Sequence, residues 1–100
     1  MSQINWKERA EHMNFNGQAF INGQRVDALS GATFECISPC DGRKLADVAR
    51  CDKADVDAAV SVAREAFEDG RWAHLSPRKR KEILIRFADL IVQSKNELAL

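Results

Sequence analysis

Cysteine and histidine are the residues of this chain whose side chains could act as nucleophiles or metal ligands. There are three cysteines, Cys36, Cys40 and Cys51, and two histidines, His12 and His74. A tetrahedral zinc site needs four ligands, and this spacing fits no common zinc module. A thiolate nucleophile needs a nearby base, which the neighbouring sequence does not offer. An odd cysteine count also disfavours a disulfide framework, so buried or half-buried structural cysteines are the favoured interpretation.

A basic run, Arg78 to Lys81, is the second candidate for chemistry because it could bind phosphate groups. It falls in the first turn of a predicted helix, where the helix dipole disfavours cations. The same residues also fit a solvated face that precedes an apolar stripe, and this interpretation is favoured. The chain has no glycine-rich phosphate-binding motif. Local chemistry therefore indicates no active site.

Turn-forming residues divide the first half of the chain into short strands. Asn22-Gly23 predicts a β-hairpin with a type I′ turn, because both residue types tolerate a positive φ. Pro39 and Asp41-Gly42 predict a second turn. The strands that this pattern predicts are residues 20–21, 24–26, 33–37 and 44–50.

Helical periodicity begins at Asp52, which is a suitable N-cap. An apolar stripe runs from Val56 to Phe67, and Gly70 can end this helix in a left-handed conformation. Ser76 and Pro77 fit the N-cap and first position of a second helix. Its apolar face runs from Ile83 to Ile91, so two amphipathic helices follow the strands.

Two further helices are predicted at the ends of the chain. Ile4 to Met13 fits a short amphipathic helix, and Ser94 to Glu97 has the capping-box pattern that opens another. This last helix has scarcely begun at Leu100. The chain is therefore expected to be truncated.

Composition restricts the class of protein. One hundred residues suggest one domain at most, and 45% hydrophobic with 30% charged residues is typical of a soluble globular protein. Fifteen basic residues balance fifteen acidic ones, so no net charge favours nucleic acid or an anionic membrane. No apolar run could span a bilayer and no signal peptide is evident. We expect a soluble cytoplasmic protein with an α+β arrangement.

A set of short motifs follows a fixed order along the chain. The motifs are FING at 20–23, SGATF at 30–34, DVDAAVSVAREAF at 55–67, Trp72, RFADLI at 86–91 and ELA at 97–99. The whole ordered set, rather than any one motif, resembles the N-terminal segment of the aldehyde dehydrogenase superfamily. The resemblance covers about Ala19 to Leu100, and Ser38-Pro39 stands where Asn-Pro is usual.

The resemblance implies a fold class and a domain organisation. The fold would be α/β, with residues 19–100 forming the N-terminal part of a Rossmann-like NAD(P)-binding domain from short peripheral strands and helices. Residues 1–18 would be an N-terminal helical extension. The stretches ISPCDGR and CDKADVDAAV are similar to enzymes that act on γ-glutamylated aminoaldehydes in putrescine breakdown.

The resemblance also implies a function. The complete enzyme would be an NAD- or NADP-dependent aldehyde dehydrogenase that oxidises an aldehyde to a carboxylic acid, and it would form a homodimer or homotetramer. Its catalytic and cofactor-binding residues would lie beyond Leu100. Many members bind Na⁺ or K⁺ through main-chain carbonyls before the Asn-Pro turn, which correspond here to Cys36 and Ile37.

Two alternatives from other classes stay open on the sequence. One is a stand-alone small α+β module that binds nucleic acid through the basic helix start at residues 78–81. The other is a structural interaction protein without catalytic activity. Balanced charge and few aromatic residues count against nucleic-acid binding.

Overall fold

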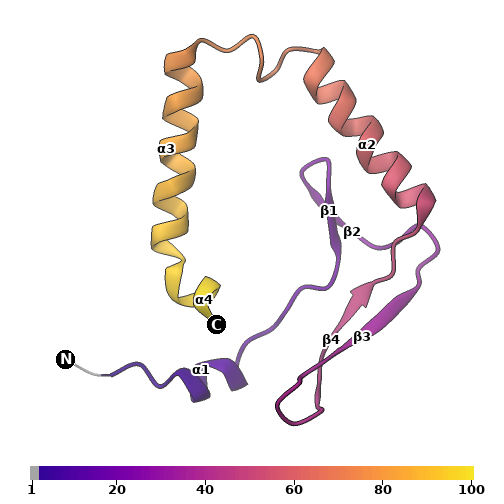
Figure 1. Ribbon diagram of the computed structural model, residues 1–100, viewed down its shortest axis with the longest axis vertical. Coiled ribbons are helices and arrows are strands. Elements are labelled where there is room, and N and C mark those ends of the chain that lie inside the picture. Colours follow the sequence, from indigo (N-terminus) through magenta and orange to yellow (C-terminus); the bar gives the residue numbers. More distant parts are fainter. Residues whose placement is uncertain (1–2) are drawn as a thin grey trace. The chain divides into compact units, whose positions relative to one another are not determined.

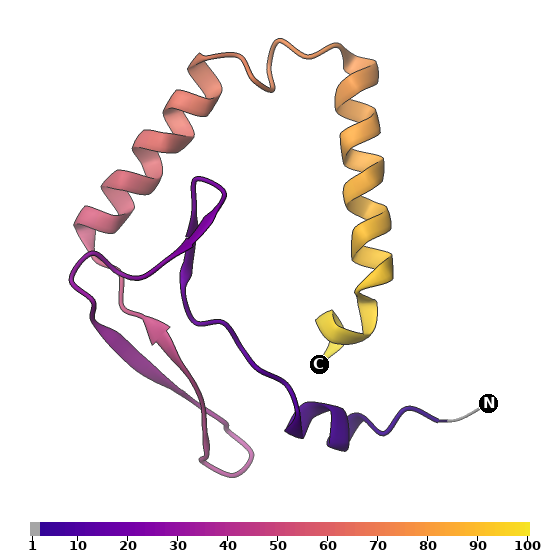
Figure 2. The same ribbon diagram turned by 180° about the vertical axis from the view of Figure 1, so that it is seen from behind.

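The computed structural model describes residues 3–100 and divides into two compact units. One unit consists of residues 14–68, and the other combines the N-terminal residues up to 13 with residues 69–100. Figure 1 shows the elements in chain order, and Figure 2 shows them from behind. The two units are described separately.

The unit of residues 14–68 contains two small antiparallel sheets. The first pairs β1 (Ala19–Ile21) with β2 (Gln24–Val26). The connecting residues Asn22 and Gly23 have φ values of 55° and 75°, which are the positive angles of a type I′ turn. This confirms the hairpin that the sequence predicts.

The second sheet pairs β3 (Thr33–Ile37) with β4 (Lys44–Ala49). Its turn is closed by two main-chain hydrogen bonds, from Ser38 N–H to the Arg43 carbonyl at 2.8 Å and from Gly42 N–H to the Ser38 carbonyl at 2.9 Å. The predicted strands are therefore confirmed to within a residue. Figure 2 shows the pair as one long hairpin.

Helix α2 (Lys53–Glu68) completes this unit. It begins directly after Asp52, whose carboxylate accepts a hydrogen bond from Ala54 N–H at 3.2 Å. That is the N-cap role predicted from the sequence. Gly70 follows the helix with a φ of 77°, as expected for a left-handed residue at a helix C-terminus.

The other unit is helical in its described part and contains α1 (Trp6–Glu11), α3 (Pro77–Gln93) and α4 (Lys95–Ala99). Helix α1 is shorter than the stretch from Ile4 to Met13 that the periodicity predicts. Ser76 caps α3 as expected, because its hydroxyl accepts from Lys79 N–H at 3.2 Å.

The capping box predicted at Ser94 is wrong. Ser94 makes no side-chain cap hydrogen bond, although α4 begins at the next residue. Its φ and ψ of −102° and 13° are not the extended values of an N-cap. The reason is that Ser94 also ends α3, where its N–H donates to the carbonyls of Leu90 and Ile91.

Little of the described chain is buried. Ala28 is the one buried apolar residue among residues 3–100, and Asp55 the one buried charged residue. Both amphipathic helices leave their apolar stripes exposed; Val60 and Phe67 on α2 are 61% and 67% exposed, and Phe87 on α3 is 60% exposed. No helix in the described part is long and apolar enough to span a bilayer.

Candidate functional site

The two main-chain carbonyls expected to bind a cation lie where the pairing of β3 with β4 changes register. Cys36 pairs with Ala46, whereas Ile37 pairs with Lys44. The extra residue, Leu45, therefore belongs to β4. The alternation of main-chain groups along β3 continues through both candidate residues.

This alternation determines the direction of each carbonyl. Ala32 and Ser38, at the two ends of β3, each form a main-chain hydrogen bond of 2.8 Å to residues that flank β4. Residues at even positions of this strand thus direct their main-chain groups toward β4. Cys36 shares that side, whereas the Ile37 carbonyl lies on the opposite edge, which pairs with no other strand among the described residues.

The donor set fits a cation in part. Carbonyl oxygens suit hard cations, and the Ile37 carbonyl lies on the open edge. The Cys36 carbonyl faces the sheet, so it would have to bind a cation with its second lone pair. Within residues 3–100 no cluster of three or more His, Cys, Asp or Glu side chains could hold a metal ion. Additional oxygen ligands would have to complete such a site.

All three cysteines are free and exposed, so the expectation of buried or half-buried cysteines is wrong. The hairpin of β3 and β4 has too little apolar surface around it to cover Cys36 or Cys40. Partial desolvation raises the pKa of the Cys51 thiol, and the negative charges of Asp55 and Asp52 raise it further. The Cys51 thiolate is thereby disfavoured, which argues against a nucleophilic role.

Asp55 joins two segments that are distant in the sequence. One carboxylate oxygen accepts from Leu29 N–H at 2.9 Å and the other from Asp52 N–H at 3.0 Å. The bond from Leu29 fixes the loop after β2 to the first turn of α2, and the bond from Asp52 lies within the start of the helix. Asp55 is only 4% exposed, and both bonds are partly shielded from water.

The environment of Asp55 stabilises its charged form. The hydrogen bond from Asp52 N–H is the largest cause of its lowered pKa, and the bond from Leu29 N–H is the second. Asp55 also lies in the first turn of α2, where the helix dipole favours a negative charge. No sequence pattern indicates the bond to Leu29. The spacing of Asp52 and Asp55 is that of a capping box and could have revealed the bond between them.

Gly17 lies against the main chain of β4. Its carbonyl accepts from Ala49 N–H at 2.7 Å, and a Cβ added at Gly17 would lie 1.8 Å from the Asp47 carbonyl oxygen. This close approach requires glycine. Beside it lies a hollow of about 160 Å³, smaller than most ligand pockets, lined by Phe15, Asn16, Gly17, Cys36, Leu45, Ala46 and Val48.

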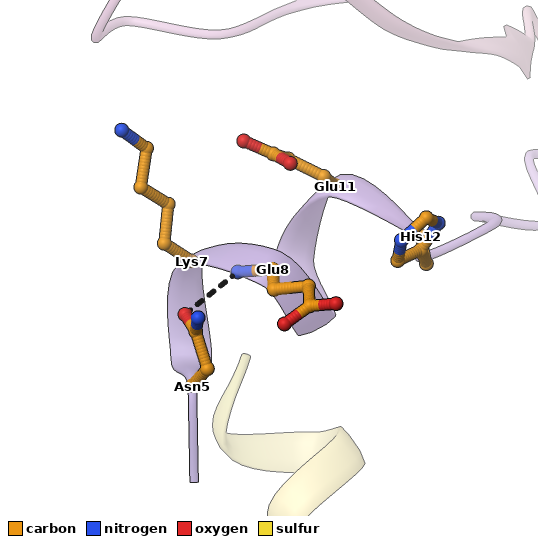
Figure 3. A pocket seen from close by; sticks show the side chains of 5 residues that line it. All are labelled: Asn5, Lys7, Glu8, Glu11 and His12. Atoms are coloured by element: carbon orange, nitrogen blue, oxygen red, sulfur yellow. Dashed lines mark hydrogen bonds between the residues drawn. The ribbon is translucent and has the colours of Figure 1, made fainter.

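A second hollow lies on the polar surface of α1 and is lined by Asn5, Lys7, Glu8, Glu11 and His12. The Asn5 side chain accepts from Glu8 N–H at 3.1 Å and so caps the helix. Figure 3 shows that the side chains of Glu8 and Glu11 extend in different directions. These groups do not converge on a common point, so the surface offers neither a metal site nor an acid–base pair.

The basic run at the start of α3 agrees with a solvated surface. Arg78, Lys79 and Lys81 are exposed, and Arg80 is half-buried. Phe87 is the one aromatic residue of α3, and the rest of its apolar face is aliphatic, so the helix lacks a series of aromatic platforms for bases. No observation therefore favours nucleic-acid binding by this segment.

Comparison with known proteins defines the class. The family model described as "Aldehyde dehydrogenase family" matches residues 26–100, which is three quarters of the chain. The chain therefore belongs to the aldehyde dehydrogenase family. The aminoacetaldehyde dehydrogenase of Pseudomonas aeruginosa is 42% identical over 99 residues, which are 99% of this chain and 20% of that protein.

Solved structures show the same relationship, because the chain matches the N-terminal part of the aldehyde dehydrogenase fold. Indole-3-acetaldehyde dehydrogenase AldA of P. syringae, in complex with NAD⁺ and IAA, is 53% identical with a TM-score of 0.91, covering 95% of this chain and 19% of that one. The γ-glutamyl-γ-aminobutyraldehyde dehydrogenase of Burkholderia cenocepacia is 50% identical with a TM-score of 0.86, covering 90% and 18%. The chain thus spans about a fifth of each of these three proteins.

Proposed function

We propose that this chain is the N-terminal portion of an NAD(P)-dependent aldehyde dehydrogenase that oxidises an aldehyde to a carboxylic acid. The family match over residues 26–100 carries the proposal. In such an enzyme a cysteine thiolate adds to the aldehyde, NAD(P) accepts the hydride, and water releases the acid. We assign no catalytic role to residues 3–100, because the family resemblance implies a nucleophilic cysteine beyond Leu100. No cluster of His, Cys, Asp or Glu side chains in this range could hold a metal ion either.

Within this enzyme, residues 19–100 would form the first part of the NAD(P)-binding domain, and residues 1–18 a helical extension. The exposed stripes of α2 and α3 support the first assignment. Apolar surface of this extent is normally buried against further structure. The described part of residues 1–18 contains one short helix, α1, which supports their assignment as a helical extension.

The test of this function is the complete reading frame. Its product should contain a downstream cysteine in a motif of the type G-Q-x-C and should reduce NAD⁺ or NADP⁺ in the presence of an aldehyde. A variant that replaces this cysteine by alanine is the matched control and should be inactive while remaining folded. A frame that ends at Leu100, or a folded product without dehydrogenase activity, would refute the proposal.

For the substrate, an aminoaldehyde of putrescine breakdown is the favoured class. The γ-glutamyl-γ-aminobutyraldehyde dehydrogenase and the aminoacetaldehyde dehydrogenase support it, at 50% and 42% identity. The indole-3-acetaldehyde dehydrogenase is as similar, at 53%. Values of kcat/KM for γ-glutamyl-γ-aminobutyraldehyde, aminoacetaldehyde and indole-3-acetaldehyde would identify the preferred substrate, since differences in kcat/KM report differential transition-state binding. A higher value for indole-3-acetaldehyde would overturn this choice.

A Na⁺ or K⁺ ion is proposed at the open edge of β3, with the Ile37 carbonyl as a ligand and the Cys36 carbonyl as a second. Rb⁺ is a suitable probe, because its anomalous scattering distinguishes it from water. Crystals of the full-length enzyme grown in Rb⁺ should show a peak against the Ile37 carbonyl. The C36S variant is the control and should keep the peak, since it leaves both carbonyls in place. A water molecule that is unchanged by cation exchange would refute the site.

The full-length enzyme is further proposed to act in the cytoplasm as a homodimer or homotetramer. Balanced charge supports neither a membrane nor a nucleic-acid partner. Light scattering of the purified enzyme would measure the assembly, and a monomer at micromolar concentration would refute it. Cell fractionation would test the location of the enzyme. Recovery of the enzyme in the membrane fraction would contradict a cytoplasmic location.

A further inference from the structure

We draw no further inference here: the strongest candidate, the exposed apolar face of α2 around the shallow groove lined by Val60, Ala63, Arg64 and Phe67, carries nothing because nothing in the structure shows what covers it.

Discussion

Replacement of Gly17 by alanine should break the contact between the segment before β1 and strand β4. The new methyl group would lie 1.8 Å from the Asp47 carbonyl oxygen, and the obstacle is main chain rather than a movable side chain. To restore an ordinary van der Waals contact the segments must separate by about 1.5 Å. The hydrogen bond from Ala49 N–H to the Gly17 carbonyl, now 2.7 Å, would then be too long to persist.

The energetic cost of G17A has two parts. Overpacking against a fixed neighbour typically costs about 1–3 kcal/mol. The lost hydrogen bond adds about 1 kcal/mol. We therefore expect the full-length enzyme to lose about 2–4 kcal/mol of stability at this contact. Since 1.4 kcal/mol corresponds to a factor of ten, the Ala49 amide should exchange its hydrogen roughly 30-fold to 700-fold faster.

Hydrogen exchange of the Ala49 amide is the assay, with G42A as the matched control. Gly42 lies in the turn between β3 and β4 at a φ of 75°, and a Cβ there would contact nothing within 4 Å. That variant should show only the strain of a left-handed residue, about 1–2 kcal/mol. An Ala49 amide that exchanges no faster in G17A than in G42A would refute the steric argument.

Three further predictions follow from the described side chains. D55N should lower the melting temperature, because an amide cannot accept both the Leu29 and Asp52 N–H groups as a carboxylate does. The pKa of Asp55 is lower in the folded than in the unfolded protein. Its contribution to folding stability is therefore complete above the unfolded pKa and is lost as pH falls through the folded pKa. The difference in melting temperature between wild type and D55N should accordingly shrink in acid. If that difference persists at low pH, the negative charge of Asp55 does not contribute to stability. Replacement of all three cysteines by serine should leave turnover of the full-length enzyme within a few-fold, since all three are exposed and the Cys51 thiolate is disfavoured by the negative charges beside it. A loss of roughly a thousandfold in a folded variant would show a misassigned catalytic group. The isolated 100-residue chain should show no NAD reduction, be partly helical and self-associate through its exposed stripes; a monomer with a sharp two-state transition and a strong near-UV circular dichroism signal would contradict this.

The features that the sequence predicts correctly are those set by neighbouring residues. The Asn22-Gly23 turn and the Ser76-Pro77 helix start depend on φ preferences and one local hydrogen bond. Each of these two dipeptides acts within about four positions of the chain, so its effect can be predicted without knowledge of the rest of the fold.

The features that the sequence does not predict depend on distant or competing contacts. The bond from Leu29 to Asp55 spans 26 positions, and no local pattern marks Leu29 as its donor. Ser94 has the residue type of an N-cap, but its main chain is already engaged as the end of α3. The register shift in the second hairpin leaves no signal, because Leu45 is as suitable for a strand as its neighbours.

Almost all pairing in residues 14–68 joins strands that follow one another directly, which has a consequence for synthesis on the ribosome. Such hairpins form within about 1–10 μs, so this segment can acquire its secondary structure as soon as it emerges. If the enzyme has the length of its relatives, roughly four fifths of the chain would follow. At about 5–20 residues per second, that takes on the order of tens of seconds. Throughout that time the apolar stripes of α2 and α3 would be exposed to solvent, which makes the nascent segment a substrate for chaperones that bind hydrophobic helices.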